Sequence, residues 1–350
     1  MRTLSLFAFV IGIELYAYQA LATIFPGSSI LPIIYFSITA ILIAAVLLFV
    51  NAGLKKRVNL PRGVLTGTFF MLFIPKLFTA ILLLGEYIVR LGKTLAMGIV
   101  HVAGNESFYL GTERSLVWSI ISVSIAGLLS LSFVYGALFN VYNYKVRKVN
   151  VKLMKLPKAF DGLKVVQISD IHSGSLTDKA AVQKAVEKIN SLHPDVIFFT
   201  GDLVNNLATE AVSFVDVFKH LQAPHGVYSV LGNHDYGDYA AWPSEESKQN
   251  NLNMLKKIHG EMGWRLLLNE HVKIEKDGEK IVVAGVENWS ASGRFHSYGK
   301  LDAALHGIQD AITVLLLSHD PSHWEAEILK HPAHVDLTFS GHTHGMQFGF

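Results

Sequence analysis

Long apolar runs dominate the first 140 residues of the chain, and much shorter ones fill the rest. The long runs cover about residues 4–24, 29–50, 64–89 and 115–139. Each reaches the ~20 residues that an α-helix needs to cross the hydrocarbon core of a bilayer. The first run is longer than the apolar part of a typical secretory signal, and no clear small-x-small cleavage site precedes the second, so we expect it to be retained. The pattern predicts an all-α transmembrane domain of four helices over residues 1–140.

From residue 163 onward, apolar runs of strand length alternate with helical patterns. We expect strands at 164–169, 195–200, 226–231, 266–268, 272–275, 280–284, 311–317 and 335–339. We expect helices at 177–191, 209–221, 245–262 and 322–330, the first of them capped by Thr177. Strands that alternate with helices predict a sheet covered on both faces. Residues 163–350 are therefore predicted to form an α/β domain.

The joint between these halves, residues 141–162, is predicted to be a linker that contains the first strand of the second domain. Residues 145–153 partly alternate between polar and apolar, as a half-buried strand does. A basic strip lying on the membrane surface is the alternative interpretation. We favour the strand.

Charge divides the chain in the same way as hydropathy. Residues 1–150 hold 12 Lys or Arg and 4 Asp or Glu, whereas residues 151–350 hold 18 and 24, so a net charge of +8 adjoins one of −6. The acidic second half excludes a basic nucleic-acid-binding domain there, and we expect no nucleic-acid partner.

The absence of cysteine excludes disulfides and thiolate-bound zinc. Any metal must therefore be bound by His, Asp, Glu or Asn.

Basic residues in the short loops predict the orientation in the membrane. Lys55, Lys56, Arg57 and Arg62 lie between the second and third runs, and five more basic residues follow the fourth. Because the side of the membrane richer in Lys and Arg is cytoplasmic, we expect both termini and the acidic domain there, in a multi-pass protein of the cell inner membrane.

Three charged residues, Glu14, Lys76 and Glu86, fall within or near the ends of the apolar runs. Such groups are expensive in lipid and can mark an intramembrane functional site. The alternative is a structural pair, or side chains that reach the interface near span ends. We favour the alternative.

Residues that can bind metals follow five of the predicted strands. They are Asp170 and His172, Asp202, Asn233 with His234 and Asp235, His319, and His342 with His344. Sites in open α/β sheets form at the carboxyl ends of strands, so we expect these groups to converge. In an extended chain residues i and i+2 point the same way, which would bring each His or Asp pair to one place.

The chemistry of this set favours transition metals. Imidazole and carboxylate ligands without sulfur suit Mn, Fe, Zn or Ni. Two ions about 3.5–4 Å apart would need a bridging ligand, and a carboxylate such as Asp202 can bridge. The sequence therefore predicts a site for two divalent metal ions.

The order DxH…GD…GNHD…H…GHTH resembles the calcineurin-like metallophosphoesterase superfamily over about residues 163–346. The resemblance implies a sandwich of mixed sheets flanked by helices. It also implies that a first metal is held by Asp170, His172, Asp202 and His344, and a second by Asp202, Asn233, His319 and His342. A hydroxide bridging the metals would attack phosphorus. His234 would stabilise charge and protonate the leaving oxygen, and Asp235 would orient His234.

The sequence departs from that family's pattern at three places. Asn205 stands where many relatives have an acid, Met346 follows Gly345 where a second glycine is common, and the chain ends at Phe350. The last point leaves two alternatives, a short final sheet edge or a domain truncated at its C-terminus.

Four further residues have two interpretations each. Arg294 either contacts a substrate phosphate or is a solvated loop residue. Tyr236, Tyr239 and Trp242 either line a substrate groove or pack against the rest of the domain.

These features together predict a membrane-anchored phosphoesterase that uses two metals. It would hydrolyse a phosphomonoester, phosphodiester or pyrophosphate bond. The membrane spans make a lipid-linked substrate attractive, because they hold the site beside the lipid headgroups. The alternative function is a non-catalytic membrane module that uses the same fold for binding or sensing.

Overall fold

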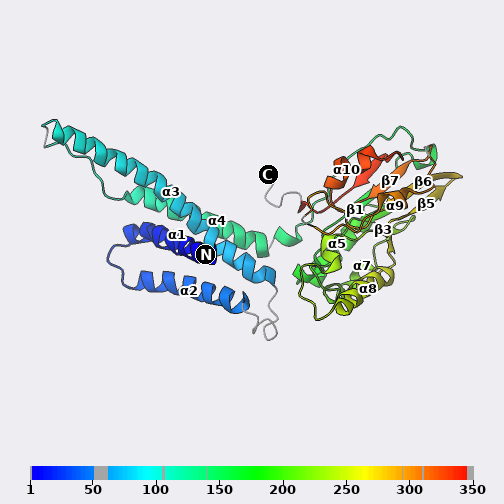
Figure 1. Cartoon of the computed structure of the whole chain (residues 1–350), viewed down its shortest axis with the longest axis horizontal. Helices are drawn as coiled ribbons and strands as arrows, with labels where there is room; N and C mark the ends of the chain where they lie inside the picture. Colours follow the sequence, from blue (N-terminus) through cyan, green and yellow to red (C-terminus); the bar gives the residue numbers. More distant parts are fainter. Residues whose placement is uncertain are drawn as a thin grey trace. The chain divides into compact units, whose positions relative to one another are not determined.

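The computed structural model describes residues 2–50, 62–104, 107–138, 140–293, 295–309 and 311–344. The chain divides into two compact units, Met1–Asn143 and Tyr144–Phe350. Figure 1 shows helices in the first unit and a mixture of strands and helices in the second. The two units are described separately below.

The first unit contains the four long helices that the apolar runs predicted. They are α1 (Arg2–Ile24), α2 (Ile30–Val50), α3 (Arg62–Val102) and α4 (Leu116–Leu138). Helix α3 continues well beyond the predicted end at residue 89. Residues 90–102 contain no proline that would end the helix, so it continues beyond the point where the apolar run is interrupted.

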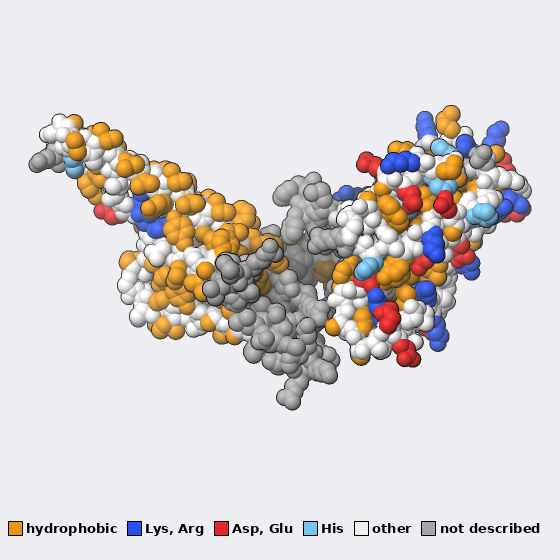
Figure 2. All heavy atoms as spheres, in the orientation of Figure 1, with side chains coloured by type: hydrophobic (Ala, Val, Ile, Leu, Met, Phe, Trp, Pro, Cys, Tyr) orange, Lys and Arg blue, Asp and Glu red, His pale blue; other side chains and the backbone are white. Residues whose placement is uncertain are grey.

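These helices present apolar side chains outward. In Figure 2 hydrophobic side chains cover much of the visible face of the helical unit, whereas charged side chains are spread over the other unit. Among the described residues, Gly67–Val102 and Leu116–Gly136 are long and apolar enough to cross a membrane, and Ala8–Ile24 and Ile30–Ile41 are shorter apolar stretches. A contiguous apolar surface of this kind is typical of a membrane domain.

The three charged residues noted in the apolar runs form ion pairs. Lys76 Nζ lies 2.8 Å from Glu14 Oε2 and donates to Thr39 Oγ1, so three helices share one buried pair. Glu86 pairs with Arg90, one turn further along α3, at 2.9 Å. The structure therefore favours the structural interpretation of Glu14, Lys76 and Glu86, with Arg90 as a partner that the sequence analysis did not assign.

The second unit is built on two sheets of four strands. The first is wholly parallel in the order β1-β2-β3-β4, comprising β1 (Val165–Ile168), β2 (Val196–Phe199), β3 (Val227–Ser229) and β4 (Arg265–Leu266). The second is ordered β5-β6-β7-β8, comprising β5 (Glu270–Lys276), β6 (Glu279–Gly285), β7 (Val314–Leu317) and β8 (Leu337–Phe339). Among the described strands of this sheet, only β5 and β6, joined by a turn at Asp277-Gly278, pair in antiparallel fashion. The predicted α/β sandwich with a mixed sheet is confirmed.

One core joins the two sheets. Phe198 of the first sheet and Ile281, Val283 and Leu317 of the second are buried in the same cluster. Successive residues of a strand point to opposite faces, so Val282 and Ala284 of β6 instead face a second core built with α9 (Leu301–Leu305). The shared core thus packs the two sheets against each other.

The remaining helices differ in part from the predicted ranges. Helix α5 (Lys179–Asn190) is capped by Asp178, whose side chain accepts from Ala181 N, so the prediction of Thr177 as the cap was wrong. The predicted helix 209–221 is two short helices, α6 (Thr209–Val212) and α7 (Val215–Phe218). Their β-branched valines are weak helix formers. Helices α8 (Glu245–Glu261) and α10 (Ser322–Ala326) lie within the predicted ranges.

The predicted strand at residues 145–153 was wrong. Residues 143–153 form neither helix nor strand, because Val149 and Val151 are 81% and 52% exposed and gain no burial from the alternation. Short 3₁₀ turns flank this segment, η1 (Asn140–Tyr142) and η2 (Lys158–Phe160). Phe160 is fully buried and Leu156 packs against the same core, so the end of the predicted linker belongs to the second unit.

Candidate metal centre

The site lies where parallel strands from both sheets end. Strands β1, β2 and β3 lead into Asp170, Asp202 and Asn233, and β7 and β8 lead into His319 and His342. Hydrogen bonds tie these ends together across the two sheets. His319 Nδ1 donates to the Thr200 carbonyl at 2.7 Å, and His342 N donates to the Asp170 carboxylate at 3.1 Å. Residues far apart in the sequence therefore meet, as the strand-end argument predicted.

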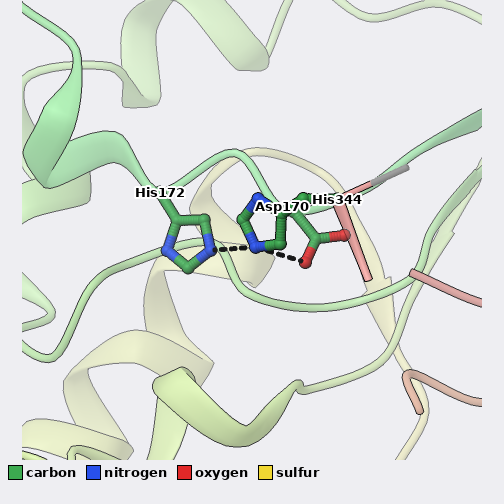
Figure 3. A group of neighbouring side chains, drawn as sticks. All are labelled: Asp170, His172 and His344. Carbon is green, nitrogen blue, oxygen red and sulfur yellow. Dashed lines mark hydrogen bonds and ion pairs between the residues drawn. The ribbon is translucent and has the colours of Figure 1, made fainter. Parts of the chain in front are cut away.

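A first group of ligand-type side chains comprises Asp170, His172 and His344 (Figure 3). His172 Nε2 and His344 Nε2 lie 3.3 Å apart, and His344 Nε2 lies 3.4 Å from Asp170 Oδ1. Figure 3 shows the two rings and the carboxylate directed toward one another. These atoms are close enough to share one cation.

A second group comprises Asp202, His319 and His342. The amide oxygen of Asn233 completes it, at 3.1 Å from His319 Nε2 and 2.9 Å from His342 Nδ1. Asp202, Asn233 and His319 are buried, and His342 is partly buried. The second group is therefore the more enclosed of the two.

Asp202 stands between the groups. Its Oδ2 atom lies 3.6 Å from His172 Nε2 and 3.2 Å from His319 Nε2. Its other oxygen, Oδ1, accepts from the backbone N–H of His234 at 2.9 Å. The carboxylate is thus oriented by the chain and presents Oδ2 to both groups, which is the geometry that a bridging ligand requires.

The backbone around the ligands is not extended, so the argument from extended i, i+2 pairs was wrong. Asp170, His172, His342 and His344 all have left-handed backbone angles, with φ of 53°, 46°, 69° and 51°, as does Asp202 with 60°. A non-glycine residue in a sparsely populated conformation costs about 1–3 kcal/mol and persists where its surroundings over-determine it. Here backbone bonds hold the turns, since Asp170 N donates to Gly201 O and His172 N to Asp202 O.

The tautomers of two histidines are set by backbone carbonyls. His319 Nδ1–H donates to Thr200 O, which leaves Nε2 directed at the second group. His234 Nδ1–H donates to Asn205 O at 2.7 Å in the same manner. A hydrogen bond at one imidazole nitrogen leaves the other available to bind a metal or a substrate.

Burial and opposite charge shape the pKa values at the second group. Burial disfavours charge on both members of the Asp202–His319 pair, but their mutual hydrogen bond and attraction prevail. As a result the pKa of Asp202 falls to about 2 and that of His319 rises to about 9. Burial, and then the charge of His319, lower the pKa of His342, and burial lowers the pKa of His172.

Asp235 does not orient the His234 ring, so that prediction was wrong. Its buried carboxylate accepts four backbone N–H groups, from Asp202, Leu203, Val204 and Gly232. Burial and then the charge of Asp202 raise the pKa of Asp235 to about 7, against the pull of these donors. Asp235 therefore shapes the turn that carries Asp202, and the carbonyl of Asn205 orients His234.

The sequence analysis missed Glu210. Its carboxylate accepts the backbone N–H groups of Asn205, Asn206 and Leu207, at 2.6, 3.3 and 3.1 Å. It thereby holds the loop whose Asn205 carbonyl fixes His234. An acid in the first turn of a helix is common for electrostatic reasons alone, so its position gave no distinguishing signal.

The aromatic residues after His234 have separate places. Tyr236 is buried and stacks on Tyr298 at 3.8 Å, so it packs. Trp242 donates to Gly237 O at 2.8 Å, and Tyr239 is 39% exposed beside the His234 ring.

The predicted features at Lys55, Lys56, Arg57, Arg294, Gly345, Met346 and Phe350 lie outside the described residues.

The donor set can hold divalent cations. In each group at least three imidazole or carboxylate ligand atoms lie within 4.8 Å of one another. In the buried second group two acceptor oxygens, Asp202 Oδ2 and Asn233 Oδ1, converge on His319 Nε2, and a cation placed there would satisfy both. The set contains nitrogen and oxygen but no sulfur, which suits Mn, Fe, Zn or Ni.

Comparison with known families gives two matches along the chain. The family described as "Probable Calcineurin-like phosphoesterase, transmembrane domain" matches residues 1–141. The family described as "Calcineurin-like phosphoesterase" matches residues 163–346, which contain every ligand-type residue discussed above.

Curated relatives agree with these matches. A Danio rerio protein described as "Transmembrane protein with metallophosphoesterase domain" is 29% identical over 265 residues, covering 74% of this chain and 55% of the relative. A Caenorhabditis elegans "Putative metallophosphoesterase F40B5.2" is 27% identical, and the match covers 64% of this chain and 45% of the relative. The chain thus spans about half the length of these two. The Bacillus subtilis "Uncharacterized metallophosphoesterase YkuE" is 26% identical, with 67% and 78% covered.

Proposed function

Because the chain belongs to the calcineurin-like phosphoesterase family and carries a transmembrane domain, we propose that it is a membrane-anchored phosphoesterase dependent on two metals. The observation that carries this proposal is the position of Asp202. Its Oδ2 atom lies within 3.6 Å of a histidine nitrogen from each ligand group. A single carboxylate that faces two groups is the feature that distinguishes a two-metal site from two independent sites.

We assign the ligands as the family resemblance implies. Asp170, His172, Asp202 and His344 would hold the first metal, and Asp202, Asn233, His319 and His342 would hold the second. When bound, such a pair of ions polarises a phosphoryl group and lowers the pKa of a water that attacks phosphorus. The chain's contribution is to fix the spacing of these ligands through the five strand ends.

His234 acts on the substrate in this proposal. Its ring lies edge-on to that of His172 at 4.9 Å between centroids, so it borders the first group. The Asn205 carbonyl accepts from Nδ1–H, so a second proton on the ring would lie on Nε2, from which it can be donated to a phosphoryl oxygen and transferred to the leaving oxygen, returning the ring to its neutral form. A positioned imidazole of this kind contributes about 10²–10⁴-fold to proton-transfer steps.

The substrate would be a phosphomonoester, a phosphodiester or a pyrophosphate, and a lipid-linked one fits the membrane anchor best. The excess of Lys and Arg in the loop between α2 and α3 and after α4 supports a cytoplasmic catalytic domain on a four-span protein of the inner membrane. Because the chain has no cysteine, single cysteines at Lys256 and Glu113 test this. We expect a membrane-impermeant maleimide to label intact cells only at the Glu113 position, and the reverse pattern would overturn the orientation.

The activity is tested on the purified full chain in detergent. After treatment with EDTA and addition of Mn²⁺, we expect hydrolysis of p-nitrophenyl phosphate or its bis ester. The D202N variant should fall to background, because it removes the charge that faces both groups. D216N is the matched control, since Asp216 is an exposed partner of Lys179 on the surface and should leave turnover unchanged.

Two results would contradict the proposal. Turnover that survives both EDTA and D202N would contradict the dependence on metals. Mn²⁺ binding without turnover of either ester, or of phospholipids, sugar-nucleotide lipids and nucleotides, would favour a binding or sensing module.

A further inference from the structure

A loop that follows the Asn233–Asp235 segment folds back over the second ligand group. The 3₁₀ turn η4 (Asn233–Tyr236) ends at Gly237, whose left-handed φ of 68° reverses the chain. The indole of Trp242 donates to the Gly237 carbonyl at 2.8 Å and closes the loop. A Cβ on Gly237 would lie 2.8 Å from the Trp242 ring, so this turn requires glycine. Tyr239 lies within the loop that this hydrogen bond closes.

Tyr239 contacts two functional residues at once. Its hydroxyl accepts from Asn233 Nδ2 at 2.9 Å. Its ring packs against that of His234, with centroids 4.7 Å apart and planes tilted by 48°. Asn233 directs its other amide atom, Oδ1, at His319 and His342.

From these contacts we infer that Tyr239 is a positioning residue that holds the amide plane of Asn233 so that oxygen, and not nitrogen, faces the second metal, while its ring holds His234. An amide oxygen binds a cation and an amide NH₂ group does not, so rotation of this plane would remove a ligand. The inference rests on the proposed function in treating Asn233 as a ligand.

The hydroxyl and the ring have separable roles. Removal of the hydroxyl leaves Asn233 Nδ2 without its partner, whereas the ring still supports His234. Partners that orient a metal ligand typically contribute 10–100-fold to metal affinity. Because Tyr239 is 39% exposed, water can replace part of the lost bond, so we expect about tenfold, the lower end of that range.

The experiment compares Y239F and Y239A with Y298F. Tyr298 is the matched control, because its hydroxyl contacts Asp238 at 3.2 Å and its ring stacks on Tyr236, away from the ligands. Mn²⁺ binding to the EDTA-treated full chain is measured by titration calorimetry. We expect Y239F to weaken one of two Mn²⁺ sites about tenfold and to leave the other, and Y298F to weaken neither.

Turnover separates the two roles further. At saturating Mn²⁺, Y239F should recover the wild-type kcat, because excess metal compensates for the loosened ligand. Y239A should stay low under the same conditions, because His234 loses its ring contact. Unchanged Mn²⁺ affinity in Y239F, or an equal loss in Y298F, would overturn the inference.

The calorimetry does not depend on turnover, so the two proposals fail in different ways. A protein that binds Mn²⁺ at two sites, one of them weakened in Y239F, yet hydrolyses nothing, supports the role of Tyr239 and contradicts the enzyme. A protein that turns over substrate with equal Mn²⁺ affinities in wild type and Y239F supports the enzyme and contradicts this role.

Discussion

Asp202 Oδ2 lies 3.2 Å from His319 Nε2, and both side chains are almost fully buried. In the metal-free protein this contact is an ion pair, since the pKa of His319 rises to about 9 and that of Asp202 falls to about 2. The nitrogen that carries the proton is the one that faces the proposed second metal. A cation and this proton therefore compete for one position.

The first prediction is that metal binding releases this proton. At pH 7 His319 is protonated, because its pKa lies above the solution pH, so binding of Mn²⁺ at the second site should release about one proton. The affinity of that site should rise about tenfold per pH unit between pH 7 and 9 and then level off. Calorimetry in two buffers of different ionisation enthalpy measures the release.

The D202N variant provides the comparison for this release. Loss of the carboxylate removes the attraction that keeps His319 protonated, so fewer protons should be displaced per ion bound. Equal enthalpies in the two buffers for the wild-type protein at pH 7 would show that His319 is already neutral.

The second prediction concerns Gly341, which lies just before His342. A Cβ at this position would overlap Ser169 Oγ and Asp170 Oδ2. The G341A variant should therefore displace Asp170, and we expect it to bind one Mn²⁺ with much reduced affinity and to lose activity. G260A is the matched control, because Gly260 lies in α8 and a Cβ added there would meet open space. If G341A binds two Mn²⁺ ions as tightly as G260A, the close packing of Asp170 is not required.

The sequence predicted which side chains meet, but not how the backbone presents them. The residue type determines which side-chain atoms can bind a metal, so Asp170, Asp202 and His319 could be identified at predicted strand ends. The left-handed backbone angles of Asp170 and His342 arise from backbone hydrogen bonds between distant turns, and the residue types do not predict such angles. The role of Asn205 could not be predicted from its residue type either, because the atom that contacts His234 is its backbone carbonyl oxygen, which every residue possesses.

The fold shows a similar division. Apolar runs predicted the four long helices, because length and hydropathy alone determine a helix in that setting. The alternation at 145–153 misled, because a strand also needs a neighbour and burial, and Val149 has neither. The pairing of Lys76 with Glu14, 62 positions apart, depends on helix packing that one sequence does not reveal.

The third prediction concerns Glu210, which binds three backbone N–H groups of the loop that carries Asn205. In E210Q an NH₂ group faces some of these donors, so the loop should shift and His234 should lose its fixed orientation. We expect kcat to fall by about tenfold or more, with KM and Mn²⁺ affinity nearly unchanged. The control is E187Q, an exposed glutamate on α5. A loss of Mn²⁺ affinity equal to the loss of kcat would show that Glu210 supports the ligands instead.

The last prediction concerns stability and uses a buried histidine away from the metal ligands. His259 on α8 is fully buried, its Nδ1 contacts Ser229 Oγ at 2.9 Å, and burial lowers its pKa to about 3. Within the described part of the chain its Nε2 has no hydrogen-bond partner, so protonation there would bury an uncompensated charge. His259 therefore stays neutral in the folded state at pH values where it is protonated in the unfolded state.

The sign follows from which state binds more protons. Between about pH 6.5 and pH 3 the unfolded chain carries a proton on this residue and the folded chain does not, so stability falls as the pH falls. The contribution approaches about 1.4 kcal/mol per pH unit across that window. H259N keeps a short polar side chain but does not titrate, and it should show a pH slope smaller by about this amount. Denaturant unfolding of the EDTA-treated full chain at pH 7, 6, 5 and 4 measures both slopes. The other titrating groups are common to the two proteins and cancel in the difference, so equal slopes would mean that His259 accepts its proton in the folded state.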